Sequence, residues 1–355
     1  MRLLPLVLAC ATTLVAPADY SFFCTPPGAA FCDARDEAGA ATPAGPTSPG
    51  TVLMGGGTDV DAAFAWQISR AGGGDFLVLR ESGTDAYNEY IFALGLTRPC
   101  GAPAALASAA TLILNSRRAA ADPFVLAKVA AAEAIFFAGG DQSKYVERIA
   151  GTPLQDLLIA KQANVTLGGT SAGNAIEGRF VYTGARGSAV SADALADPYG
   201  APGMAAGSLV GALLASPPLL AARVVMDDHF VTRDRMGRMM TFVARAVADG
   251  RAPTARGIGV DEVSALLVEP DGAARLVGDG TAYMCDSSAV AAATCARGQP
   301  LTLADVRCER LQAAGFDDCD DPAADTFDLS AWRGSGVRYA YNITEGVIVG
   351  QPYGP

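Results

Sequence analysis

The sequence predicts an α/β fold, in which a mostly parallel β-sheet is covered by helices on both faces and is extended by antiparallel strands toward the end of the chain. Between residues 51 and 173, short apolar runs alternate with stretches of helical periodicity. The apolar runs are continuous, as in parallel strands buried on both faces. After residue 240, two apolar runs flank Asp271-Gly272, which predicts a β-hairpin.

The expected elements follow one another in strand–helix order. The predicted strands lie within 51–57, 75–83, 110–116, 134–142 and 163–173, and the predicted helices within 59–74, 88–96, 122–133 and 143–162. The helix over 122–133 has a clear beginning, because Asp122 can cap it and Pro123 suits its first turn. The last strand of the chain is expected within 339–350.

The composition favours a soluble protein and gives no sign of nucleic-acid binding. The 355 residues are half hydrophobic, with a formal net charge of −11 and a pI near 4.6. No run of Lys or Arg is present, so no nucleic-acid partner is expected. The acidic balance would tolerate or attract a basic substrate. The length allows one or two domains, and we expect a single catalytic domain over 51–355.

The first 18 residues predict a secretory signal peptide. One Arg precedes an apolar run over 3–15, and the sequence APA at 16–18 has the small residues of a cleavage site. The run is too short to span a membrane, and no later stretch is long and apolar enough. We therefore expect a secreted or extracytoplasmic protein, with a lipoprotein anchored at Cys10 as the alternative. Residues 19–50, rich in Pro, Gly and Ala, predict an arm or linker.

The eight cysteines suggest disulfides in an oxidising compartment. If Cys10 is removed with the signal peptide, seven remain. Close spacing then suggests the pairs Cys24–Cys32, Cys285–Cys295 and Cys308–Cys319, which would leave Cys100 over. Spacing alone does not determine the connectivity. Because the chain has no C-x-x-C pair and a single histidine, we expect no metal site.

The stretch LGGTSAGNAIEG, residues 167–178, predicts a nucleophile elbow at Ser171. Gly169 and Gly173 flank the serine in the G-x-S-x-G spacing. The elbow needs small residues because the chain bends sharply from a strand into a helix, which lifts the hydroxyl away from the sheet. The helix N-terminus behind the serine stabilises negative charge. The alternative interpretation is an ordinary turn in a chain that has 40 glycines.

A serine nucleophile needs a base, and the chain contains one histidine, His229. It follows the apolar run at 222–226, and site residues of α/β enzymes lie at the carboxyl ends of strands. A lysine base would have to be one of three residues that lie in no recognisable site motif: Lys128, Lys144 or Lys161.

A carboxylate should orient the histidine. The order Ser–acid–His leaves several candidates between the two residues: Glu177, Asp193, Asp197, Asp227 and Asp228. The backbone N–H of Ala172, which follows the nucleophile, can form one half of an oxyanion hole, and Gly139 or Gly140 can supply the other. The alternative for these two glycines is an ordinary strand-to-helix turn.

Six segments together resemble one family of peptidases. They are, in order, VLMGGGTDVDAAF, GGGDFLVLRESGTDAYNEYI, IFFAGGDQSKYV, GGTSAGNA, DDHFVTRDRMGRM and GIGVDEVSALLV. Over roughly 51–350 the chain resembles the cyanophycinases and their relatives, which are serine peptidases related to dipeptidase E. The resemblance implies a three-layer α/β sandwich like that of class I glutamine amidotransferases, with serine in place of cysteine as the nucleophile.

The resemblance also implies roles for individual residues. The nucleophile falls on Ser171 and the base on His229, and no cofactor is needed. The family's backbone oxyanion site falls on the GGDQ segment, 139–142, where Asp141 and Gln142 would meet substrate. The stretch VSADALADPYG resembles a family segment in which an acid precedes Ala-Leu, which favours Asp193 as the acid.

The implied substrate is cyanophycin, a polyaspartate with arginine on each side-chain carboxyl, which cyanophycinases cleave to β-Asp-Arg dipeptides. Its guanidinium groups would need carboxylate partners. The acids that follow predicted strand ends are Asp59, Asp61, Asp85, Glu89 and Asp141. Other aspartyl or isoaspartyl peptides are an alternative, as are a catalytically silent binding module on the same fold and a lipase or esterase. A homodimer is left open.

Overall fold

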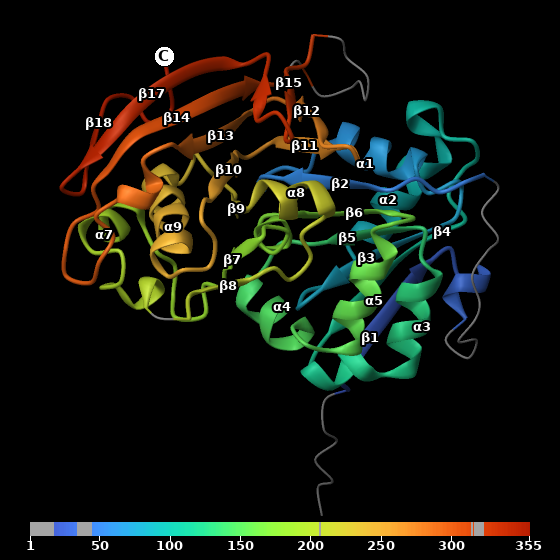
Figure 1. Ribbon diagram of the computed structural model, residues 1–355. Coiled ribbons are helices and arrows are strands. Elements are labelled where there is room, and N and C mark those ends of the chain that lie inside the picture. The colour runs from blue at the N-terminus through green and yellow to red at the C-terminus, as the bar shows by residue number, and fades with distance from the viewer. Residues whose placement is uncertain (1–17, 34–44, 206, 314, 316–322) are drawn as a thin grey trace, which may run out of the picture.

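The computed structural model confirms the α/β class, with two mixed β-sheets and helices packed around them (Figure 1). It describes residues 18–33, 45–205, 207–313, 315 and 323–355. The predicted signal peptide falls almost entirely outside the described residues, as does part of the predicted arm. The two sheets matter for function because the residues of the site come from both of them.

The first sheet contains a parallel centre with antiparallel strands on both sides. Its ten described strands run in the order β1 (Tyr20–Thr25), β4 (Ser108–Leu114), β3 (Asp75–Arg80), β5 (Ala134–Phe137), β6 (Thr166–Thr170), β2 (Gly50–Met54), β11 (Ser264–Val268), β12 (Ala273–Gly278), β15 (Thr326–Asp328) and β16 (Arg333–Gly334). Strands β4, β3, β5, β6 and β2 are parallel neighbours. The predicted hairpin at Asp271-Gly272 is present, because β11 and β12 pair antiparallel on either side of it.

Helices cover both faces of this sheet. Helices α1 (Asp61–Ser69) and α2 (Tyr87–Leu96) pack on one face, where Phe64 and Ile91 join a buried cluster with Val52 and Val78. On the other face lie α3 (Pro123–Ala131), α4 (Gln142–Ile149) and α5 (Pro153–Lys161). Asp122 caps α3 as expected, accepting the N–H of Phe124 at 2.9 Å. Within the described ranges, no helix combines the length and the apolar character that crossing a membrane requires.

The second sheet is mostly antiparallel. Its eight described strands run in the order β18 (Val347–Val349), β17 (Val337–Thr344), β14 (Leu303–Gln312), β13 (Thr281–Ser287), β10 (Arg256–Val260), β9 (Val224–Asp227), β7 (Phe180–Tyr182) and β8 (Leu209–Gly211). Strands β7, β9 and β10 are parallel neighbours. Two short helices, α7 (Ser191–Ala196) and α8 (Pro217–Ala222), lie in the connections between β7 and β9.

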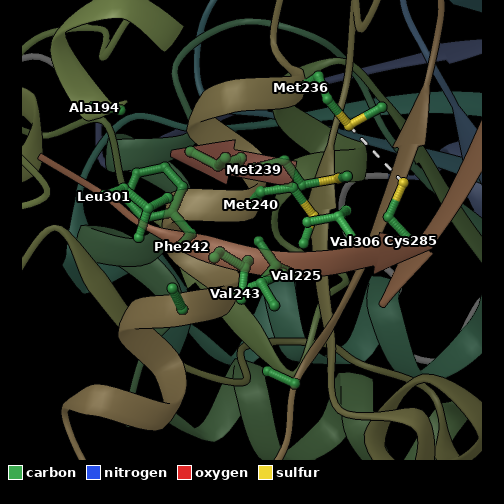
Figure 2. Close-up of a cluster of buried hydrophobic side chains, with 14 of the residues drawn as sticks. Ala194, Val225, Met236, Met239, Met240, Phe242, Val243, Cys285, Leu301 and Val306 are labelled. Carbon is green, nitrogen blue, oxygen red and sulfur yellow. Dashed lines mark hydrogen bonds between the residues drawn. The ribbon is translucent and has the colours of Figure 1, made fainter. Parts of the chain in front are cut away.

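Helix α9 (Met236–Ala248) packs against one face of the second sheet. Figure 2 shows Met236 and Met240 of α9 beside Val306 and Cys285, which lie on β14 and β13. This contact is buried on all sides, since each of the two methionines is 0% exposed. The helix therefore begins at a fixed place relative to the second sheet, directly after the segment that carries His229.

A separate buried cluster joins the two sheets. It contains Leu53 of β2 and Leu266 of β11 from the first sheet, together with Met226 of β9 and Ile258 of β10 from the second. The chain passes from the second sheet to the first between β10 and β11, through residues 261–263. The carboxyl ends of β6, β9 and β10 are thereby held near one another.

Two disulfides join described residues in different parts of the molecule, and the pairing differs in part from the expectation. Cys100, which the expected pairs leave over, is disulfide-bonded as well. Cys24–Cys32 forms as predicted, within the predicted arm, of which β1 pairs antiparallel with β4. Cys285 pairs with Cys308 rather than with Cys295, which has a free thiol. The reason is geometric: Cys285 and Cys308 are direct neighbours on β13 and β14, with Cα atoms 4.2 Å apart. Cys319 lies outside the described residues.

Candidate active site

Ser171 lies at a sharp turn between β6 and the short helix α6 (Ala172–Ala175), as a nucleophile elbow requires. Its backbone has φ 52° and ψ −117°, a strained conformation for a residue with a side chain. A Cβ atom at Gly169 would lie 2.5 Å from the carbonyl carbon of Gly173, and one at Gly173 would lie 2.1 Å from the carbonyl oxygen of Phe137. Both flanking positions therefore require glycine.

His229 links Ser171 to a carboxylate. Its Nε2 atom lies 2.8 Å from the hydroxyl oxygen of Ser171, and its Nδ1 atom hydrogen-bonds to Oε1 of Glu262. When Nδ1 carries the proton toward Glu262, Nε2 is free to accept the serine proton. The imidazole is 8% exposed, so water competes little for these contacts. The three residues thus form the arrangement that activates a serine.

Three glycines at the end of β2 make room for this arrangement. A Cβ atom at Gly56 would lie 2.4 Å from Cε1 of His229, and one at Gly57 would lie 3.0 Å from Cβ of Glu262. The carbonyl of Gly55 also accepts the backbone N–H of His229 at 2.8 Å. The run GGG after the first predicted strand is therefore part of the site, a role that the sequence analysis did not assign.

Asp193, favoured from the resemblance as the acid, is not at the histidine. It lies exposed in α7, and Glu262 occupies the place at Nδ1. The order assumed for the three residues was the source of the error, because the acid follows His229 in the chain instead of preceding it. Glu262 is the second residue after β10, the parallel neighbour of β9, within the segment GIGVDEVSALLV. An acid at the end of that apolar run was the signal available in the sequence.

Two of the other candidate acids, Asp227 and Asp228, form hydrogen bonds with nearby arginines. Asp227 receives two hydrogen bonds from Arg238, at 2.8 and 2.5 Å, and Asp228 receives one from Arg235 at 2.7 Å. Asp228 lies 3.7 Å from Nε2 of His229, on the serine side of the ring, so it cannot orient Nδ1. Neither residue is free to play the part of Glu262.

The remaining two acids lack contact with the histidine. Asp197 accepts the backbone N–H of Tyr199 at 2.9 Å. Glu177 is fully buried behind the elbow, and burial raises the pKa of its carboxyl well above the usual range. A carboxyl that stays protonated does not stabilise an imidazolium.

The predicted oxyanion residues lie around the nucleophile. Ala172 is the first residue of α6, so its N–H belongs to the N-terminus of that helix. A Cβ atom at Gly139 would lie 3.4 Å from Cβ of Ser171, which shows how closely the backbone approaches the serine there. Gly140 has φ +148°, and a side chain at this position would collide with Glu81, 2.4 Å away.

A pocket of about 200 Å³ opens beside Ser171, and the charged side chains that line it are mostly arginines. Arg233, Arg235 and Arg238 face one acid, Asp228. Arg235 and Arg238 have ion-pair partners, whereas no ion pair of Arg233 exists among the described residues. The charge balance favours an anionic group such as a carboxylate.

The acidic lining expected for a guanidinium group is not found in this pocket. Of the two residues expected to meet substrate, Gln142 lines it, whereas Asp141 caps α4 by accepting the N–H of Ser143 at 2.8 Å. Asp59 and Asp61 accept hydrogen bonds from tyrosines of α2. Asp85 and Glu89 are likewise absent from the lining. The acids follow strand ends as expected, but none of these five lines the pocket beside Ser171.

The fold and the site together define an α/β protein with a Ser–His–Glu hydrogen-bonded chain at a nucleophile elbow. Among known proteins, a cyanophycinase from Geminocystis herdmanii is 32% identical over 159 residues, which is 44% of this chain and 50% of that protein. A cyanophycinase from Trichormus variabilis is 30% identical over 164 residues, covering 46% of this chain and 48% of the relative. These matches confirm the predicted resemblance to the cyanophycinase-like peptidases.

The chain spans about half the length of the curated relatives that it matches. No family model matches it. Among solved structures, a peptidase from an acI-B1 Actinobacterium has a TM-score of 0.47 and 18% sequence identity, and the match covers 76% of this chain and 96% of that one.

Proposed function

We propose that this protein is a serine peptidase of the cyanophycinase type. The observation that carries the proposal is the hydrogen-bonded chain from Ser171 through His229 to Glu262 at a strained elbow. A structural serine does not need a buried imidazole at 2.8 Å whose second nitrogen is bound to a carboxylate. The similarity to cyanophycinases adds independent support.

In the proposed reaction, the Ser171 hydroxyl attacks the carbonyl carbon of the scissile bond while its proton passes to Nε2 of His229. Glu262 stabilises the imidazolium that forms, and N–H groups at Ala172 and at Gly139 or Gly140 hold the oxyanion. The carbon–nitrogen bond then breaks as His229 returns the proton to the leaving amine. Water, activated by the same histidine, hydrolyses the resulting acyl-enzyme ester on Ser171.

For the substrate, we propose an aspartyl or isoaspartyl peptide, with cyanophycin as the first to test. The arginines of the pocket suit a carboxylate of such a substrate. A dipeptidase for other acidic peptides is the second candidate, because the described pocket offers a guanidinium group few carboxylates. Both candidates use Ser171, His229 and Glu262 in the same roles.

We also infer that the fold is of the class I glutamine amidotransferase type, and that the protein acts outside the cytoplasm. The first inference is supported by five parallel strands with helices on both faces and an elbow after β6. The second is supported by the predicted signal peptide and by the disulfides Cys24–Cys32 and Cys285–Cys308.

The test is incubation of purified protein with cyanophycin and with a panel of α- and β-aspartyl dipeptides, with products identified by mass. We expect Ser171→Ala to lower turnover by about 10⁴-fold while the circular dichroism spectrum stays the same. Release of β-Asp-Arg would support cyanophycin as the substrate, and cleavage of dipeptides alone would support the second candidate. Full activity of Ser171→Ala would refute the mechanism.

A further inference from the structure

The segment from His229 to Arg235 carries several residues of the site. It begins with the proposed base, ends directly before α9, and carries two arginines of the pocket, Arg233 and Arg235. Two of its residues, His229 and Asp234, have positive φ angles of 44° and 47°. Residues with side chains adopt such angles only when their surroundings hold them there.

One tyrosine, Tyr353, contacts this segment at two points and the first residue of α9 at a third. Its hydroxyl accepts the backbone N–H of Met236 at 3.2 Å and donates to Oδ1 of Asp234 at 2.8 Å. The carbonyl oxygen of Phe230 lies 3.4 Å from the same hydroxyl. The N–H of Met236 belongs to the first turn of α9, where helix N–H groups have no partner within the helix. One hydroxyl group thus contacts Phe230 near the beginning of the segment, Asp234 near its end, and Met236 at the start of α9.

The ring of Tyr353 is held as well. It packs edge-on against Phe230 and Tyr283, with centroid distances of 5.9 and 5.6 Å. Tyr339 of β17 donates its hydroxyl to the carbonyl of Pro352 at 2.7 Å, which fixes the chain next to Tyr353. The second sheet therefore places Tyr353, and Tyr353 in turn restrains the segment that follows β9.

Phe230 transmits this restraint to the base. It is adjacent to His229 in the chain and is 0% exposed. Its ring lies against Gly259 of β10, where a Cβ atom would come within 2.4 Å of it. Little room exists for Phe230 to move, so a change in its backbone is passed on to His229, whose Nε2 must stay within reach of Ser171.

We propose that Tyr353 is a positioning residue for the Ser171–His229 pair, acting through the segment 229–236. Tyr353 does not touch the reacting atoms. Its hydroxyl keeps the base at the serine by holding Phe230, Asp234 and Met236 in one arrangement. This inference rests on the proposed function, and its test separates the two.

The experiment measures how fast a small uncharged fluorophosphonate labels Ser171 in the full chain, resolved into a binding constant and a maximal rate of labelling. We expect Tyr353→Phe to lower the maximal rate about tenfold and to leave the binding constant unchanged. If the role of Tyr353 is purely structural, the substitution should lower the melting temperature. The maximal rate of labelling, measured at temperatures well below that melting temperature, should then stay unchanged. An unchanged rate in folded Tyr353→Phe would overturn the inference.

Tyr341→Phe is the matched control. The hydroxyl of Tyr341 is buried and has no hydrogen-bond partner among the described residues, so its removal should leave labelling within twofold of the unmodified protein. Should Tyr353→Phe fail to fold, Tyr339→Phe decides the question, since it releases Pro352 alone. A reduced maximal rate in that variant supports the inference, and an unchanged one overturns it. If the unmodified protein is not labelled at Ser171 at all, the proposed function fails and the inference falls with it.

Discussion

Among the described residues, the carboxyl group of Glu262 forms one hydrogen bond, to Nδ1 of His229. That contact selects the tautomer in which Nε2 faces Ser171, and it stabilises the charge that the ring acquires during attack. The side chain of Glu262 is 26% exposed, so its carboxyl group is partly hydrated. At the scale of single residues, the acid can therefore be tested separately from the fold.

We expect Glu262→Gln to lower kcat/KM at least 100-fold and to leave the melting temperature within a few degrees, since the amide keeps the shape but not the charge. Steady-state kinetics would measure the effect, on whichever candidate peptide the incubation experiment shows to be cleaved. Asp193→Asn is the control. Asp193 is exposed on α7, so its substitution should leave kcat/KM unchanged. Loss of activity in the control together with normal activity in Glu262→Gln would restore Asp193 as the acid.

Gly56→Ala tests the space beneath the imidazole. The added methyl group would lie 2.4 Å from the His229 ring, at a position whose φ of +101° already disfavours a side chain. We expect loss of serine labelling by more than tenfold, because His229 must move. Gly211→Ala serves as the comparison, since a Cβ atom there has no neighbour within 4 Å. Equal labelling of the two variants would show that the ring tolerates the displacement.

At the scale of elements, the site depends on parallel neighbours. Strands β9 and β10 run side by side in the same direction, with Asp227 opposite Gly259. The residues that follow each strand consequently emerge at the same edge, which brings Glu262 to His229.

In the first sheet, a buried carboxyl group lies at the opposite ends of the strands and has a different role. Glu133 directly precedes β5 there and accepts the N–H of Asp75, the first residue of β3, at 2.7 Å.

Burial raises the pKa of Glu133 from 4.5 to about 7. Between these values the unfolded chain loses a proton that the folded protein keeps, so the free energy of unfolding should fall as pH rises from 4.5 to 7. The fall attributable to this residue is on the order of 3 kcal/mol. Urea unfolding across this range, compared between the unmodified protein and Glu133→Gln, should show a flatter dependence in the variant. Glu147→Gln is the control, because Glu147 forms an exposed ion pair with Lys144, and the pH dependence of its free energy of unfolding should match that of the unmodified protein. The same pH dependence in all three proteins would contradict the raised pKa of Glu133.

At the scale of the whole molecule, the parts of the site that could be predicted are those encoded locally. The elbow could be predicted because Gly169, Ser171 and Gly173 are neighbours in the chain, and the base because His229 is the only histidine. The acid, the arginine pocket and the Cys285–Cys308 pairing depend on which strands lie side by side. Apolar runs predict that strands exist, but the pairing of β13 with β14, or of β9 with β10, is settled by packing between segments far apart in the chain.

The division of the site between two sheets also has a consequence for biosynthesis. During translation, the strands that carry the elbow emerge first, whereas His229 follows Ser171 by 58 residues and Glu262 follows the histidine by a further 33. Strand β11, which pairs with β2, comes later still. A nascent chain that has formed the elbow thus has neither base nor acid beside it, because domains fold from the N-terminal side during synthesis. Ser171 therefore gains its hydrogen-bonded imidazole and carboxylate only after the second sheet has docked on the first.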